Sequence, residues 1–443
     1  MELSRTNLTA NQRDYAIYLP ALNTAFFHPF LANVSEYVGL ESKIQRCNYT
    51  TPQGAFQYKW NLVSAGHVQL DLNRDVESET FYRKRDKNYM FVLGDSGGFQ
   101  IAQGVWPAHW ANDKCPAAYS YRKRVLEWMD KYCDYGMTLD IPAWIISQPK
   151  STKQKAGVFN FEDTMRATEI NNLYWLKERK GDCKILNTLH GERLDESRQW
   201  YQHLARFCDP TFTEAHFNGW AFGGTLKTNM PNVLERLVYI VRDNLLQRGK
   251  HDWIHILGKS TPLLAVVATA LQRSLRKHVN GNLNISFDTS SPVLTGGRFK
   301  QIVYHINLFK NTDWSIKTNN TLQNISFAND NVSFVDAFKS HRKISSFMTS
   351  PVLADISAHD LTIKRYELHT NAVSVKSLFI IAHNIWCYAY GFQSANDSFD
   401  RGDRPKQLSK NSIETLIDEI IYNAESDKSL NLIRENYNQL NVI

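Results

Sequence analysis

The sequence predicts an α/β protein of the (β/α)8 barrel class, and two observations carry this prediction. Short apolar runs with polar or glycine-rich tails alternate with amphipathic helical segments along most of the chain. Strands that alternate with helices of this length form a parallel sheet, and the number of repeats favours a closed barrel over an open sheet. In such barrels, catalytic groups lie at the carboxyl ends of the strands.

The predicted strands follow one another along the chain, and most of them end on residues that suit chemistry. The first is "DYAIYLPALNT" at residues 14–24, and the eighth strand is left without an assigned place. The other candidates are "NYMFVLGDSGG" (88–98), "YGMTLDIP" (135–142), "CKILNTLHG" (183–191), "WAFGGTL" (220–226), "IHILGKSTP" (254–262) and "LNISFDTSS" (283–291). Their tails carry acids, a histidine and glycines, so we expect a site at this rim.

Amphipathic segments between these strands have apolar residues at three- and four-residue spacing. Start signals support several of them: a Glu follows Asp195, and Thr261-Pro262 opens a helix. The predicted helices span residues 120–134, 161–180, 195–209, 230–249 and 261–280.

The C-terminal third departs from this alternation. Residues 311–333 are rich in Asn and Ser, so we expect a loop-rich insertion at about 305–365. The segment "YELHTNAVSVKSLFIIAHNIWCYAY" (366–390) predicts a long helix that closes the barrel. The domain organisation that follows is a barrel domain over residues 1–395 and a C-terminal helical extension over residues 396–443.

The composition of the chain argues against disulfide-rich, secreted and membrane-spanning proteins. A net charge of +7 permits a polyanionic partner. The 6 cysteines are scattered without a C-x-x-C pair, which argues against a disulfide framework and a sulfur-rich zinc site. The N-terminal residues lack the apolar core of a signal peptide, and no apolar run suits a membrane span. We therefore expect a soluble protein of the cytoplasm, with no membrane partner.

The stretch "FVLGDSGGFQ" (91–100) allows two interpretations. Asp-Ser-Gly-Gly is good turn chemistry, and a strand-end Asp is often a helix cap. Alternatively, the strand delivers the carboxylate of Asp95 to the rim of the barrel, and the glycines clear space for a flat ligand. The rest of the chain favours the second interpretation.

Five motifs occur in the same order as in one known superfamily. They are "DSGGFQ" (95–100), "AFGG" (221–224), "HILGKSTP" (255–262), "FDTSSPVL" (287–294) and "HNIWCYAY" (383–390). Together they make the chain resemble the tRNA-guanine transglycosylase superfamily over residues 90–390. The resemblance implies a (β/α)8 barrel that exchanges a guanine base.

Three departures indicate which branch of the superfamily the chain resembles. The segment corresponding to the zinc site keeps His359 and His369 but has no cysteine, so we expect no zinc and no other cofactor. His190-Gly191 stands where the tRNA enzymes have Gln-Gly, and no appended RNA-binding domain is visible. This combination is more similar to the DNA-guanine transglycosylases of bacteria and phages. The partners implied are DNA, a 7-deazaguanine base such as 7-cyano-7-deazaguanine, and enzymes that process the base.

Base exchange without strand cleavage breaks and remakes one glycosidic bond with retention. Retention calls for a covalent glycosyl-enzyme, and hence for a carboxylate nucleophile and a second acid/base group. Asp288 is the expected nucleophile, and Asp95 is the expected general acid/base. The alternative for each is a strand-end Asp that caps the next helix or pairs with an Arg.

Substrate-binding roles come from position and from the resemblance. Asp140 is expected to accept hydrogen bonds from the guanine edge, although it could simply cap the segment before Pro142. His190 is expected on the O6 or C7 side of the base, or as a satisfied barrel histidine. Further candidates are the Gly223-Gly224 backbone, Phe99 as a stacking ring and Ser96 as a partner of Asp95 or the base. The nucleotide has to flip to reach them.

Basic residues near the predicted rim are candidates for phosphate contacts, which make binding salt-dependent. A solvated charged face is the alternative for each of them. The candidates are Arg83, Arg85, Lys259, Arg298 and Lys300.

Other functions stay open on the sequence alone. A transglycosylase acting on tRNA would keep the same acids, and a non-catalytic nucleic-acid-binding subunit could dispense with its nucleophile. A glycoside hydrolase on the same barrel would also use paired carboxylates, but it leaves Asp140 and the glycine pair unexplained.

Overall fold

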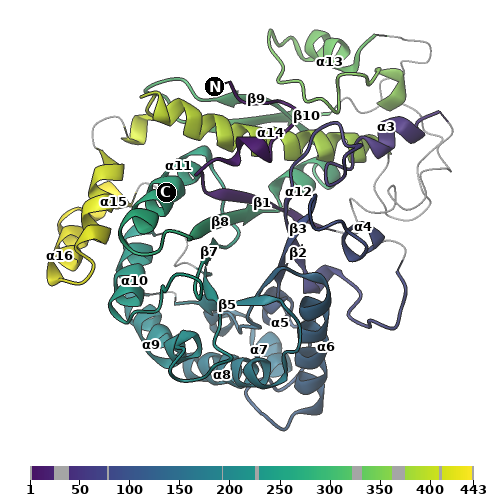
Figure 1. The fold of residues 1–443 in the computed structure, drawn as a ribbon. Helices are drawn as coiled ribbons and strands as arrows, with labels where there is room; N and C mark the ends of the chain where they lie inside the picture. Colours follow the sequence, from purple (N-terminus) through teal and green to yellow (C-terminus); the bar gives the residue numbers. More distant parts are fainter. Residues whose placement is uncertain are drawn as a thin grey trace.

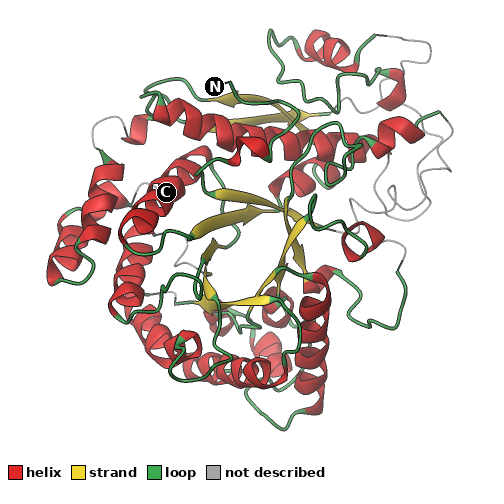
Figure 2. Ribbon diagram, viewed as in Figure 1, coloured by secondary structure: helices red, strands yellow, loops and turns green. Residues whose placement is uncertain are grey.

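Eight parallel strands form a closed barrel in the computed structural model (Figure 1; Figure 2). The structure describes residues 2–23, 39–76, 79–191, 193–224, 229–321, 332–361, 375–408 and 412–441. The strands are β1 (Ile17–Leu22), β2 (Trp60–Ser64), β3 (Phe91–Asp95), β4 (Tyr135–Met137), β5 (Lys184–Leu189), β6 (Gly219–Phe222), β7 (Trp253–Ile256) and β8 (Asn284–Thr289). The barrel closes where β1 pairs with β8, for example Leu19 with Asp288. The predicted fold class is confirmed.

The strand without a predicted place is β2, which pairs in parallel with β1 and β3. The β/α alternation is weak around it. The described helices between β1 and β3 are the short α3 (Glu41–Gln45), η3 (Ala65–His67) and α4 (Thr80–Arg83). Segments this short carry no helical periodicity to mark a repeat.

All five predicted helices are present and surround the barrel in Figure 1. They are α6 (Pro116–Tyr132), α8 (Phe161–Glu178), α9 (Leu194–Leu204), α10 (Met230–Arg242) and α11 (Pro262–His278). Side-chain caps explain where three of them start, because Asn160, Asn229 and Thr261 each accept the N–H three residues further on. Shorter elements complete this part: η1 (Ala10–Gln12), α5 (Gly98–Ala102), η5 (Ala143–Ser147), α7 (Lys150–Ala156) and η6 (Ala205–Cys208).

Alternate residues of each strand fill the inside of the barrel. Leu19, Leu93 and Leu186 belong to this inner cluster. Trp253 lies among them, and its ring stacks on Phe91 with centroids 5.0 Å apart. The amino ends of the strands are therefore packed with side chains, and the opposite rim is left for polar groups.

An insertion separates β8 from the helix that closes the barrel. It contains α12 (Ser291–Gly297), the antiparallel pair β9 (Gln301–Asn307) and β10 (Ser315–Asn320), α13 (Phe334–Arg342) and η8 (His359–Leu361). The closing helix is α14 (Val375–Asp400), which packs on α11 and α12. Because α14 continues to Asp400, residue 395, the expected end of the barrel domain, lies inside this helix.

The C-terminal extension is helical, as predicted. It comprises η10 (Lys406–Leu408), α15 (Ile413–Tyr422), α16 (Asp427–Glu435) and α17 (Tyr437–Leu440). Helices α15 and α16 lie against α11 and α10 in Figure 1, and contacts between these helices confirm the arrangement. Within the described ranges, no helix has the length and apolar character needed to cross a membrane.

Candidate active site

The acids and glycines predicted from strand ends gather at the carboxyl rim of the barrel. Asp95 is the last residue of β3, and Asp288 lies near the end of β8. Asp140 follows β4, His190 follows β5, and Gly223 follows β6. Since all strands of the barrel are parallel, these residues belong to one end of it.

Asp95 is held by the strand that the sequence did not reveal. The Ser64 hydroxyl, at the end of β2, donates to Asp95 Oδ2 at 2.6 Å, and the Gly97 N–H donates to Oδ1 at 3.4 Å. Burial raises the pKa of Asp95 to about 6; the charges of Asp140 and Asp288 add to this rise, and the Ser64 and Gly97 bonds oppose it. The carboxyl groups of Asp140 and Asp288 therefore lie close enough to Asp95 to raise its pKa further.

Asp140 and His190 form a buried pair. His190 Nε2 lies 2.7 Å from Asp140 Oδ2, and the Ser96 hydroxyl donates to Asp140 Oδ1 at 3.5 Å. His190 Nδ1 is buried and has no hydrogen-bond partner within the described ranges. The hydroxyl of Ser96 thus binds Asp140, and one ring nitrogen of His190 has no partner among the described residues.

Two glycines make room for this pair. A Cβ on Gly98 would lie 2.7 Å from the Asp140 carbonyl oxygen and 3.0 Å from Oδ2. A Cβ on Gly223 would lie 2.7 Å from His190 Cε1. Gly223 was expected to approach a base edge directly, and the structure places it against the imidazole. Gly224 has a φ of 60°, a conformation that favours glycine.

Asp288 is held through one oxygen. The Gly258 N–H donates to Asp288 Oδ1, and His255 Nε2 lies 3.2 Å from the same atom. Gly258 has a φ of 63°, so the turn after β7 aims this N–H with the help of a glycine. His255 is fully buried and was not among the predicted site residues, although it stands as a polar residue inside an apolar strand run.

Aromatic and basic side chains border the β3 and β4 part of the rim. Phe99, on α5, is 59% exposed, and its ring centroid lies 5.9 Å from that of Trp144 on η5. The next helix, α7, carries Lys150, Lys153 and Lys155. Lys153 donates to the Ile146 carbonyl at 3.2 Å, and none of the three lysines has an ion pair with a carboxylate in the described part of the chain. Trp144 and the α7 lysines were missed because no motif contains them.

Two predicted phosphate contacts are wrong. Arg83 is paired with Glu79 at 2.7 Å, and its guanidinium also donates to the Gln69 carbonyl. Arg85 is paired with Asp134 at 2.9 Å and donates to the Met90 carbonyl. Met90 and Asp134 immediately precede β3 and β4, so Arg85 lies at the amino end of the barrel. Both guanidinium groups are buried in structural contacts.

The other three basic candidates lie in different places. Lys259 follows Gly258 and is half-buried at the rim. Arg298 is exposed just after α12, at the end of that helix away from Asp288. Lys300 donates to the Ser377 hydroxyl at 3.0 Å, near the start of α14. Of this set, the structure thus places Lys259 beside the predicted catalytic residues, and the phosphate roles of all three stay predictions.

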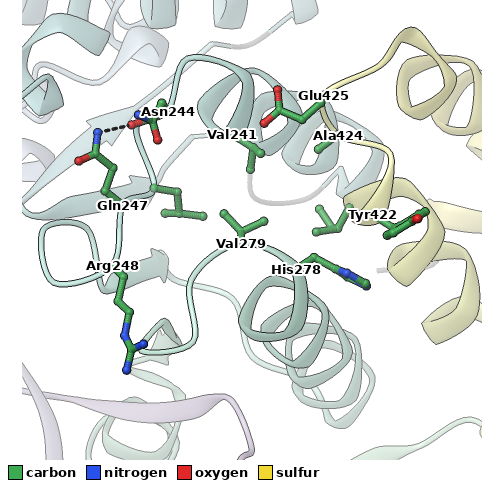
Figure 3. Close-up of a pocket in the computed structure, with 11 residues that line it drawn as sticks. Val241, Asn244, Gln247, Arg248, His278, Val279, Tyr422, Ala424 and Glu425 are labelled. Atoms are coloured by element: carbon green, nitrogen blue, oxygen red, sulfur yellow. Dashed lines mark hydrogen bonds between the residues drawn. The ribbon is translucent and has the colours of Figure 1, made fainter.

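A pocket of about 610 Å³ lies away from the rim (Figure 3). It lies between the ends of α10 and α11 and the C-terminal extension, with Arg248, His278 and Glu425 among its lining residues. None of the predicted site residues lines it.

Comparisons of the sequence with known protein families and with curated proteins assign the chain to no family. No family model matches the chain, and no curated protein sequence matches it. Among the described residues, no group of three or more His, Cys, Asp or Glu side chains could hold a metal ion. His359 belongs to η8, and His369 lies outside the described residues. What the site defines is a (β/α)8 barrel with three neighbouring carboxyl groups at its carboxyl rim.

Proposed function

We propose that this protein is a glycosyltransferase that replaces guanine in DNA with a 7-deazaguanine base. The resemblance of its strand-end motifs to the guanine transglycosylases suggests the reaction class. The observation that carries the proposal is the unequal environment of two aspartates at one rim: Asp95 has a raised pKa, while Asp288 is held by an N–H and an imidazole. When their surroundings give two neighbouring carboxyl groups different pKa values, the one with the higher pKa can act as the acid and the ionised one as the nucleophile.

In the first displacement, Asp288 attacks the anomeric carbon of a flipped nucleotide. Within the described ranges, both hydrogen-bond contacts of the Asp288 carboxylate are to Oδ1, which leaves Oδ2 as the attacking oxygen. The bond from the anomeric carbon to guanine breaks, and protonated Asp95 gives its proton to the departing base. The product of this step is a deoxyribosyl ester of Asp288 with an ionised Asp95.

In the second displacement, the incoming base replaces the ester. Asp95 accepts the proton from the nitrogen of the 7-deazaguanine, and that nitrogen bonds to the anomeric carbon as the ester breaks. Asp288 is released as a carboxylate, and Asp95 regains its proton. No net proton or electron is consumed, so the cycle returns the enzyme to its starting state.

Base recognition falls to the Asp140–His190 pair. The carboxylate of Asp140 can accept from the N1–H and amino edge that guanine and 7-deazaguanine share. With Nε2–H donating to Asp140, His190 Nδ1 is an acceptor without a partner in the described part of the chain, and it is suited to an N–H of the bound base. A buried polar atom without a partner costs free energy, and a bound base would satisfy it.

The rim beside this pair supports a nucleic-acid partner. Exposed aromatic rings stack on bases, and lysines without carboxylate partners suit phosphates. Phe99, Trp144 and the α7 lysines provide both kinds of group next to Asp95 and Asp140. We choose DNA as the proposed substrate because the sequence resembles the DNA-guanine transglycosylases. The alternative substrate to be compared with it is tRNA.

The test is incorporation of a labelled 7-deazaguanine into nucleic acid. The protein is incubated with the label and with DNA or tRNA, and the polymer is digested to nucleosides. We expect label in DNA with wild-type protein and none with Asp288→Asn, while DNA binding by the variant is retained. Asp427→Asn, whose carboxylate is exposed on α16, is the matched control and should exchange normally. Full exchange by Asp288→Asn would refute the role of Asp288 as the nucleophile. Label found only in tRNA would show that tRNA, and not DNA, is the substrate.

A further inference from the structure

A chain of three buried side chains runs from Asp288 into the interior of the barrel. His255 Nε2 lies 3.2 Å from Asp288 Oδ1, and His255 Nδ1 lies 2.8 Å from the Ser286 hydroxyl. The Trp253 indole N–H donates to the same hydroxyl at 2.7 Å. His255 and Ser286 are 0% exposed, and Trp253 is 4% exposed.

Strand periodicity explains why these four residues meet. Trp253 and His255 are two apart on β7, and Ser286 and Asp288 are two apart on β8. Residues two apart on a strand face the same side of the sheet. The two strands pair in register with His255 beside Ser286, so all four side chains share the inner face.

The donors and acceptors fix one direction along the chain. An indole nitrogen can only donate, so Ser286 Oγ must accept from Trp253. The Ser286 hydroxyl proton then has two possible acceptors, His255 Nδ1 at 2.8 Å and the Ile254 carbonyl at 3.5 Å. The shorter contact is the stronger bond. His255 Nδ1 is therefore an acceptor, and the imidazole proton is on Nε2, where it donates to Asp288.

We propose that His255, Ser286 and Trp253 are positioning residues that hold Asp288 Oδ1 and so direct Oδ2 at the anomeric carbon. This inference rests on the proposed function of Asp288 as the nucleophile. The same two donors, His255 Nε2–H and Gly258 N–H, face Oδ1, which is the carbonyl oxygen of the ester and takes a share of the carboxylate charge when the bond to Oδ2 breaks. Donors aimed at developing charge lower the barrier of that step without changing substrate binding.

A matched pair of substitutions separates this role from a structural one. In His255→Gln the amide nitrogen reaches the place of Nε2, and in His255→Asn it reaches only the place of Nδ1. We expect kcat to fall about 10- to 100-fold in His255→Asn, the loss typical of one hydrogen bond to a charged group, with KM within about threefold. His255→Gln should recover most of kcat. Equal kcat in the two variants, with both folded, would overturn the proposal.

Trapping the reaction halfway tests the step. The ester is first formed with DNA alone and the 7-deazaguanine is then added; we expect the ester to disappear more slowly in His255→Asn than in wild type, because its breakdown loses a donor. The ester is measured as protein-linked DNA after denaturation. An ester that forms and breaks down at wild-type rates in His255→Asn would contradict the inference.

The direction of the chain can be measured without any activity. In protein labelled with ¹⁵N-histidine, the imidazole resonance missing from His255→Asn belongs to His255, and its nitrogen shifts report the tautomer. We expect the Nε2–H tautomer in wild-type protein and a population of the Nδ1–H tautomer in Trp253→Phe, which lacks the fixed donor. An Nδ1–H tautomer in the wild type would overturn the inference even if base exchange occurs. Absence of exchange on every nucleic acid would instead refute the proposed function, and the tautomer would still decide the direction of the chain.

Discussion

Asp95 is the residue whose chemistry depends most on its surroundings. Its pKa of about 6 results from burial and from two neighbouring carboxyl groups. In the proposed role of general acid it must be protonated, so we expect the rate of ester formation to fall about tenfold per pH unit above pH 6. Single-turnover ester formation between pH 5 and 8 measures this limb. A rate that stays flat across pH 6 would remove Asp95 from the acid role.

The same raised pKa makes a prediction for stability. The folded protein binds the Asp95 proton up to about pH 6 and the unfolded chain only up to about 3.8, so this group favours folding at low pH and loses that contribution as pH rises through 6. Asp95→Asn removes the buried charge. We expect the variant to be about 2 kcal/mol more stable than wild type at pH 8 and unchanged at pH 3, in urea unfolding. Equal stabilisation at both pH values would contradict the electrostatic cause.

Gly98 leaves room for Asp140, which belongs to the pair proposed to recognise the base. A methyl group there would press on the Asp140 carbonyl and on its Oδ2. We expect Gly98→Ala to cost about 1–3 kcal/mol of unfolding free energy and to raise KM for the 7-deazaguanine. Gly281→Ala is the control, because its Cβ would have no heavy atom closer than 3.9 Å. Unchanged KM in folded Gly98→Ala would show that Asp140 does not bind the base.

At the residue scale, the acidic residues at the strand ends could be predicted from the sequence. The residues that hydrogen-bond to them could not. Asp95, Asp140 and Asp288 stand out because each ends an apolar run with a charged group. His255 and Ser286 lie inside such runs, and only their inward direction in a closed barrel makes them part of the site. Arg83 and Arg85 were misplaced because a run of basic residues does not show which carboxylates, here Glu79 and Asp134, will neutralise it.

At the element scale, prediction succeeded where helical periodicity was long. Helices α6, α8, α9, α10 and α11 all have at least 11 residues, and each was expected. Strand β2 was missed because short segments surround it, although its tail at Ser64 has the same apolar-to-polar change as β3. Helix α7 and η5 were also missed, since short helices carry too few repeats to be recognised.

Helix α7 is the element on which nucleic-acid binding can be tested. Replacing Lys150, Lys153 and Lys155 with Gln removes three cations beside the aromatic pair. We expect the slope of log affinity against log salt for DNA to decrease by about 2–3, since each phosphate contact contributes roughly 0.7–0.9. Titrations at several salt concentrations measure this slope. The control replaces the exposed Lys84, Lys87 and Lys184, which lie before β3 and at the start of β5. An equal decrease in the control would show that α7 is not the binding helix.

At the scale of the whole molecule, the barrel depends on elements far along the chain. Helix α14 packs on α11 and α12, and α15 packs on α11 in turn. The site residues of β7 and β8 are thus backed by layers that end in the C-terminal extension. A sequence read segment by segment shows the amphipathic faces of α14 and α15 but not which helix each one covers. We therefore expect the C-terminal extension to contribute to the stability of the whole protein without affecting the reaction at the carboxyl rim of the barrel.

Ile420 tests this division between stability and chemistry. Its side chain is fully buried on α15, so Ile420→Ala leaves a cavity in the layer against α11. We expect a loss of about 2–4 kcal/mol in one cooperative unfolding transition, with kcat and KM unchanged below that transition. Glu435→Ala, exposed on α16, should stay within about 0.5 kcal/mol of wild type. Two separate transitions in Ile420→Ala, with only the first one shifted, would contradict this expectation. They would show that the C-terminal helices unfold independently of the barrel, because a defect confined to a separate unit cannot lower the stability of the strands that hold Asp288.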